Sequence, residues 1–337
     1  MLGGLEQPML HQIADVDSRE EALAIANSES ALAEEAALIE LMQAMDDESV
    51  HSSAGLVISE HHINSEPDNN SINVRVIRPD TDAVLPCILY LHGGAMMSMS
   101  YDLGTYRAWG KVLAQQGICV AMVDFRNSLR PSTTEEVAPF PAGLNDCVSG
   151  YHWVRTNASA LKIDPESVLI AGDSGGGNLA IATTMRLVDA GQPPLGLYAL
   201  CPYILGQWPN ADYPSSEEFE GYLISVHNNH ATMAYGIEAF ERRDRYAWPG
   251  FATAENLQGF PPSMISVNEC DPLRDEGIAF YRKLLEAGVQ AHCRQLMGTV
   301  HANEMFTTVF PELTRMTARD MVGWVRECQL LTGSAPA

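Results

Sequence analysis

Positive charge is scarce in this sequence of 337 residues. Twenty Lys and Arg stand against 43 Asp and Glu, which gives a formal net charge of −23, and only Lys111, Lys162 and Lys283 are lysines. Nucleic acids and anionic membrane surfaces are therefore not expected as partners, because both are bound through a cationic field. We interpret the surplus of acid as a solubility device of the kind that a salt-tolerant protein uses.

Cysteine pairs and long hydrophobic runs are also missing. The seven cysteines occur singly, most of them inside apolar runs, and no CxxC or zinc-finger spacing is present. This pattern predicts small core residues in a reducing compartment. No stretch of about 18 apolar residues and no basic region followed by an apolar one occurs. We therefore expect a soluble, cytoplasmic protein.

What the sequence does contain is enough apolar material for one large core, with 46% hydrophobic residues. From about residue 55, short apolar runs alternate with helical ones, which predicts an α/β fold with a mostly parallel sheet flanked by helices and an antiparallel first edge. The predicted strands are 56–63, 72–77, 87–91, 118–123, 168–171, 195–200, 264–267 and 291–296. The predicted helices are 103–116, 144–156, 175–189, 273–287 and 307–327.

Residues 1–50 differ from the rest, because they hold 12 acids and one base, Arg19. Ser18 followed by Glu21 is a capping box, and apolar residues then recur at helical spacing. We predict an amphipathic helix in an N-terminal cap segment. Its apolar stripe either packs on the main body or also borders a ligand site; it comprises Leu38, Leu41, Met42 and Met45.

Residues 205–255 lack a convincing strand and are rich in aromatic side chains. They are predicted to be a helical cap insertion between two parts of the core, 51–204 and 256–337, although a second structural subdomain has the same pattern. Trp208, Phe219 and Tyr222 are candidate substrate contacts within this insertion.

The segment from Val168 to Ala180 contains an apolar strand, the turn Gly172-Asp173-Ser174-Gly175-Gly176 and a helical run. A serine on such a turn projects toward substrate, and the small neighbours allow close approach. Ser174 is therefore the predicted nucleophile. The alternative is a glycine-rich turn that serves packing or phosphate binding.

A second glycine turn, His92-Gly93-Gly94, ends another apolar strand. Exposed amides at such a turn can hold the oxyanion of acyl transfer. The predicted donors are the amides of Gly93, Gly94 and Gly175, whereas two glycines alone would indicate only a tight turn. His92 is expected to order this loop.

The acid and the base should follow the nucleophile in chain order, at the ends of later strands. Asp271 and His301 satisfy that order. Asp275 competes for the acid but falls on the next helix, where we expect a capping role. His292 competes for the base but falls inside a strand.

These motifs resemble the hormone-sensitive-lipase-like branch of the α/β-hydrolase esterases over residues 55 to 330. The resemblance rests on His92-Gly93-Gly94, on the turn around Ser174, on the Asp271-Pro272-Leu273-Arg274-Asp275-Glu276-Gly277 run and on His301. It implies an α/β-hydrolase fold with an eight-stranded sheet and a helical cap, carboxylic-ester hydrolysis without a cofactor, and a possible homodimer. Ala95 in place of a third glycine, and Ala302-Asn303 after the histidine, depart from the family pattern.

Together these features predict a serine carboxylesterase that acts on small short- to medium-chain or aryl esters through an acyl-enzyme. Met96 and Met97 follow the oxyanion turn and could line an apolar pocket or simply fill the core. An amidase or lactonase on the same triad, or a ligand-binding member that does not react, are the alternatives. His227 and His230 lack convincing acidic partners, so no metal site is expected.

Overall fold

The structure, a computed structural model, describes residues 13–333 and contains one eight-stranded sheet in the order β1-β2-β4-β3-β5-β6-β7-β8. β1 pairs antiparallel with β2 and β2 with β4, and every other pair is parallel, which confirms the predicted sheet. The strands are β1 (Leu56–Ser65), β2 (Asn70–Pro79), β3 (Leu85–Leu91), β4 (Cys119–Asp124), β5 (Ile163–Asp173), β6 (Gly196–Leu200), β7 (Ser263–Cys270) and β8 (Ala291–Val300).

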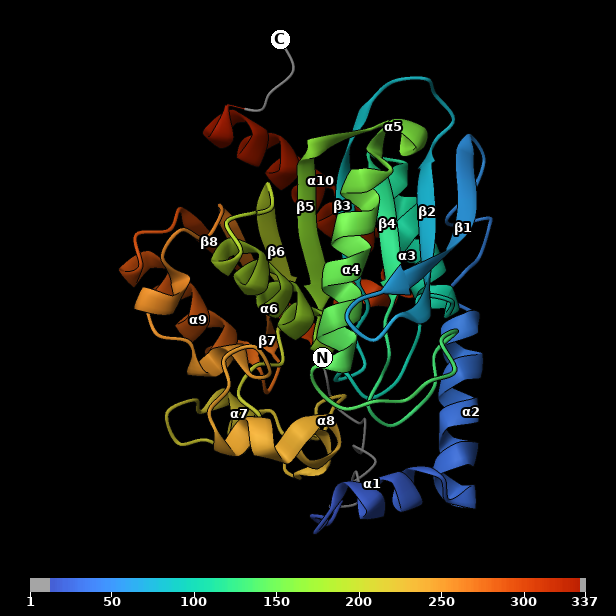
Figure 1. The fold of residues 1–337 in the computed structure, drawn as a ribbon. Helices are drawn as coiled ribbons and strands as arrows, with labels where there is room; N and C mark the ends of the chain where they lie inside the picture. The colour runs from blue at the N-terminus through green and yellow to red at the C-terminus, as the bar shows by residue number, and fades with distance from the viewer. Residues whose placement is uncertain (1–12, 334–337) are drawn as a thin grey trace.

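Helices cover both faces of the sheet (Figure 1). On one side lie α3 (Gly104–Ala114) and α10 (Pro311–Thr332), and on the other α4 (Ala142–Thr156), α6 (Gly175–Asp189) and α9 (Arg274–Glu286); the short α5 (Ala158–Leu161) precedes β5. Each layer has its own apolar cluster. In β3, Leu89 and Leu91 enter one cluster whereas Ile88 and Tyr90 enter the other. Burial on both faces explains why the strands are continuous apolar runs.

Two predicted helix boundaries were wrong. The last helix begins at Pro311 rather than at residue 307, because proline suits the first turn of a helix. The single N-terminal helix is in fact two, α1 (Arg19–Ala26) and α2 (Glu29–Gln43). Ser18 caps α1 as predicted, but Ser28 is extended and its Oγ accepts from the amide of Ala31, which starts a new helix.

The remaining helices, α7 (Ser215–Glu218) and α8 (His230–Glu241), gather with α1 and α2 at one end of the molecule (Figure 1). Between residues 205 and 255 the structure contains helical and 3₁₀ turns and no strand, as predicted. The chain after α2 is held to α3 by Asp46, which forms ion pairs with Arg107 at 2.9 Å and Lys111 at 2.6 Å. Within residues 13–333, no helix is both long enough and apolar enough to cross a membrane.

Candidate active site

Ser174 occupies the sharp turn between β5 and α6, with φ 54° and ψ −117°. A non-glycine residue rarely adopts this conformation, and its presence indicates a turn that the surrounding structure enforces. The neighbouring glycines are required sterically. A Cβ on Gly176 would lie 2.0 Å from the carbonyl oxygen of Leu91, and one on Gly172 would lie 2.3 Å from that of Gly176.

The structure brings Ser174, His301 and Asp271 together from the ends of three strands. His301 Nε2 lies 2.9 Å from Ser174 Oγ, and His301 Nδ1 lies 2.8 Å from Asp271 Oδ2. Because a carboxylate only accepts, Nδ1 carries the proton and Nε2 accepts from the serine hydroxyl. Asp271 is held in turn by the amide of Leu273, which donates to Oδ1 at 2.9 Å.

The surroundings of His301 stabilise its ring once it has accepted a proton. Burial lowers the pKa of His301, but the adjacent Asp271 carboxylate raises it, and the net shift is well upward. The carboxylate therefore stabilises the imidazolium that forms when the ring takes a proton.

The competing acid and base candidates lie elsewhere. Asp275 accepts from the amide of Ser215 and pairs with Arg274 at 2.8 Å; burial opposes ionisation, but this guanidinium holds the pKa of Asp275 below its usual value. His292 is in β8 against Trp324. His92 stacks on a phenylalanine ring, and its Nδ1 contacts the carbonyl of Gly93. None of these three contacts Ser174.

The predicted oxyanion donors need one correction. The amide of Gly93 donates to the Tyr106 hydroxyl at 2.8 Å, so it is not free to bind substrate. The amides of Gly94, Ala95 and Gly175 have no partner within residues 13–333. The backbones of Ala95 and Gly175 also lie close together, because a Cβ on Gly175 would lie 2.6 Å from the nitrogen of Ala95. The turn therefore presents the amides of Gly94 and of the residue that follows it, Ala95.

Tyr106 links this turn to the residue before the nucleophile. Its hydroxyl donates to Asp173 Oδ2 at 3.0 Å, and the hydroxyl of Tyr90 donates to Asp173 Oδ1 at 2.8 Å. Burial raises the pKa of the Asp173 carboxyl, although both tyrosine hydrogen bonds act in the opposite direction. No sequence motif marked Tyr106, because it lies in the first turn of α3, whose apolar residues predict an ordinary core helix.

A cavity of about 440 Å³ opens onto Ser174 and His301. Its lining is mostly apolar and comes from segments that are far apart in the sequence. The N-terminal segment and the 205–255 segment contribute Leu38, Leu41, Met42, Met45, Leu223, Ile224, Val226 and Ala231. The predicted stripe does both: Met42 packs against an apolar cluster of the main body and Met45 is buried, and the stripe also borders the cavity. Leu41 stays 53% exposed, and α2 buries none of its residues.

Of the five predicted substrate contacts, only Met97 is among the cavity-lining residues. Met96 is buried in the main core. Trp208 stacks on Tyr203, and its Nε1 donates to the buried Glu276 carboxyl group at 2.7 Å, so both the ring and its N–H group have partners inside the protein. Phe219 and Tyr222 pack on each other, 5.6 Å apart, with Arg274 over the Phe219 ring. The cavity wall begins at the next residue, Leu223.

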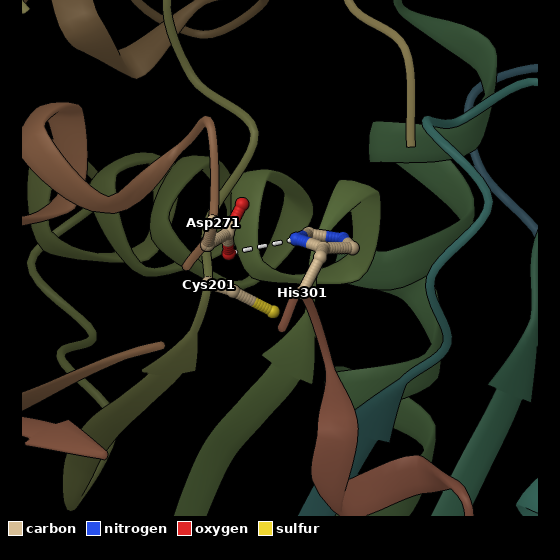
Figure 2. Close-up of side chains that lie close together, drawn as sticks. All are labelled: Cys201, Asp271 and His301. Atoms are coloured by element: carbon tan, nitrogen blue, oxygen red, sulfur yellow. Dashed lines mark hydrogen bonds and ion pairs between the residues drawn. The ribbon is translucent and has the colours of Figure 1, made fainter. Parts of the chain in front are cut away.

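One further side chain at the site escaped the sequence analysis. Cys201 follows β6, and its sulfur lies within 4.8 Å of ligand atoms of both Asp271 and His301 (Figure 2). It is fully buried, and burial raises the pKa of its thiol to about 11. Its position at the carboxyl end of a parallel strand was the signal that could have revealed it, because those ends meet at one edge.

Comparison with known proteins agrees with this geometry. Residues 88–305 match the model of a family described as having the alpha/beta hydrolase fold. The chain belongs to this family. The hydrolase is 30% identical to carboxylesterase NlhH of Mycobacterium tuberculosis over 72% of its own length and 74% of that protein. It is 29% identical to an arylesterase of Saccharolobus solfataricus, covering 70% and 74% of the two chains.

Solved structures give the same result for the hydrolase. Esterase Est22 superimposes with a TM-score of 0.92 and 53% identity, covering 94% of this chain and 95% of the other. Brefeldin A esterase, described as a bacterial homologue of human hormone-sensitive lipase, gives 0.82 and 34%, covering 95% and 89%. The resemblance inferred from the sequence motifs is confirmed at the level of family and fold.

Proposed function

We propose that this hydrolase is a serine carboxylesterase with Ser174 as nucleophile, His301 as base and Asp271 as the residue that orients it. The observation that carries the proposal is the unbroken hydrogen-bonded series from Ser174 Oγ through His301 to Asp271, at 2.9 and 2.8 Å. Relatives named carboxylesterase, arylesterase and ethyl acetate hydrolase support the same reaction class.

The chemistry has two halves. His301 Nε2 takes the Ser174 proton as Oγ attacks the ester carbonyl, and the imidazolium then gives that proton to the leaving alcohol. Water then attacks the acyl-enzyme while His301 takes its proton, and the imidazolium returns a proton to Ser174 Oγ as the carboxylic acid leaves. Asp271 stabilises the imidazolium in both halves and stays ionised throughout.

The oxyanion of each tetrahedral intermediate is held by backbone amides. We assign this role to Gly94, Ala95 and Gly175, since the amide of Gly93 is engaged by Tyr106. Amides fixed by the protein need no reorganisation when the negative charge develops, and this is typically the largest single contribution to such catalysis.

The substrate class follows from the cavity. Its apolar lining and its volume of about 440 Å³ suit small short- to medium-chain or aryl esters. In this proposal, residues 1–50 and 205–255 are caps that close the cavity over two core parts, 51–204 and 256–337. Residues 1–12 and 334–337 lie outside the described part of the chain. A homodimer stays a prediction.

The decisive experiment is hydrolysis of nitrophenyl acetate by purified wild-type protein and by Ser174→Ala. We expect loss of at least about 10⁴-fold in kcat with an unchanged circular dichroism spectrum, because the nucleophile supplies most of the catalysis. Wild-type protein without activity, or a variant as active as wild type, would contradict the proposal. A matched ester and amide pair distinguishes an esterase from an amidase on the same triad.

A further inference from the structure

We propose that Cys201, His301 and Asp271 form a binding site for a thiophilic divalent cation such as Zn²⁺, which inhibits the enzyme; the inhibition rests on the proposed function, whereas the binding does not. One ligand atom of each residue lies within 4.8 Å of the other two, and all three side chains converge on one point (Figure 2). Thiolate, imidazole and carboxylate are the groups that zinc prefers.

The spacing of these atoms suits tetrahedral coordination with small movements. From the usual zinc bond lengths, ligand atoms on one ion lie roughly 3.3 to 3.7 Å apart. His301 Nδ1 and Asp271 Oδ2 are now 2.8 Å apart, and the Cys201 sulfur lies within 4.8 Å of a ligand atom of each residue. Shifts of about 1 Å would place all three around an ion. The fourth position is left for water.

Charge balance favours the ion in this buried position. A divalent cation with one thiolate and one carboxylate carries no net charge, so the cost of burying it is low compared with that of an unpaired ion. Among the residues that line the cavity are Ser174 and His301, which gives a route of entry past the imidazole.

Coordination accounts for inhibition without any redox step. The Cys201 thiol releases its proton to solvent and the sulfur bonds to the metal. His301 Nδ1 also bonds to the metal, giving up its proton, while Nε2 gains one, so the ring stays neutral overall. Nε2 then carries a hydrogen toward Ser174 Oγ and has no lone pair with which to accept the serine proton. The nucleophile loses its base.

The binding test uses Co²⁺ and the intact wild-type protein. Cobalt bound to a thiolate gives a charge-transfer absorption band in the near ultraviolet. We expect the band in wild-type protein, its loss in Cys201→Ser and its retention in Cys270→Ser, which removes a thiol that adjoins Asp271 in sequence but is not part of the cluster. No band in wild type, or equal bands in all three proteins, would overturn the proposal.

The inhibition test measures ester hydrolysis with and without Zn²⁺ in each protein, so each variant is its own reference. We expect inhibition that a chelator reverses, and an inhibition constant raised at least about tenfold in Cys201→Ala and Cys201→Ser but not in Cys270→Ser. Equal zinc sensitivity in all the proteins would reject the site. Absence of esterase activity alongside a cobalt band that needs Cys201 would instead reject only the proposed function.

Discussion

At the scale of single residues, Tyr106 is the side chain whose importance the structure reveals most clearly. Its hydroxyl accepts from the amide of Gly93 and donates to Asp173, next to the nucleophile. One oxygen therefore connects the oxyanion turn to the serine turn. We regard Tyr106 as a positioning residue, because it acts through the backbone that holds the free amides.

We expect Tyr106→Phe to lower kcat about 10- to 100-fold with little change in KM, because misplaced oxyanion donors weaken binding of the transition state rather than of the substrate. Tyr90→Phe is the matched control, since it removes the other hydroxyl on Asp173 and leaves the Gly93 contact intact. Equal kcat losses in the two variants would mean that the loss of a hydrogen bond to Asp173, rather than the loss of the Gly93 contact, lowers kcat.

A second residue-scale prediction concerns Glu276 in the first turn of α9. Burial raises the pKa of this carboxyl to about 8, although it accepts from the amide of Ile204 and from Trp208 Nε1. In the folded state Glu276 thus keeps its proton up to about pH 8. In the unfolded chain it loses the proton near the ordinary glutamate pKa of about 4.3. The stability that the protonated group contributes is therefore complete below that lower value and falls as pH rises to about 8.

We expect Glu276→Gln to remove this dependence. The fall in the free energy of unfolding between about pH 5 and pH 8.5 should shrink by about 1 kcal/mol or more, since each unit of pKa difference corresponds to about 1.4 kcal/mol. Denaturant titration at the two pH values measures it. An unchanged fall would show that other groups cause it.

At the scale of elements, α2 is a helix whose apolar stripe borders the cavity, although Met42 also packs against a core cluster. Its stripe residue Leu41 lines the cavity, whereas Leu32 on the same helix does not, although the two are comparably exposed at 53% and 46%. We expect Leu41→Ala to raise KM several-fold for an octanoate ester and to leave KM for the acetate unchanged, because about 1 kcal/mol or more of apolar contact with the longer chain is lost. Leu32→Ala should change neither value, and a matching effect there would argue against contact with the acyl chain.

The elements also show how far the sequence could be interpreted. All eight strands and the turn of Ser174 were predictable, because burial on both faces produces apolar runs and the turn needs glycine at defined places. The break between α1 and α2 was not predicted, since a single capping serine, Ser28, decides it. The cavity wall was misplaced for a related reason. Aromatic content suggested Trp208, but its hydrogen bond to Glu276 joins residues 68 positions apart in the sequence and leaves no periodic pattern.

At the scale of the whole molecule, the net charge of −23 implies self-repulsion in the folded state. We expect the melting temperature at pH 7 to rise by about 2 to 5 °C when NaCl is raised from about 0.01 M to about 0.15 M, because the screening length falls from about 30 Å to about 8 Å. Differential scanning calorimetry measures this. A fall instead would mean that local ion pairs, such as those of Asp46 with α3, outweigh the long-range repulsion.

Two kinds of segment form the cavity. Strand ends provide Ser174 and His301, while two roof segments, around Leu41 and around Leu223, provide the apolar wall that covers them. The two roof segments are far apart in the chain, and neither belongs to the sheet. Exchanging one of them for the corresponding stretch of a relative can therefore retune which acids and alcohols fit, with the reacting atoms left in place. Substrate preference can therefore change while the catalytic residues stay the same.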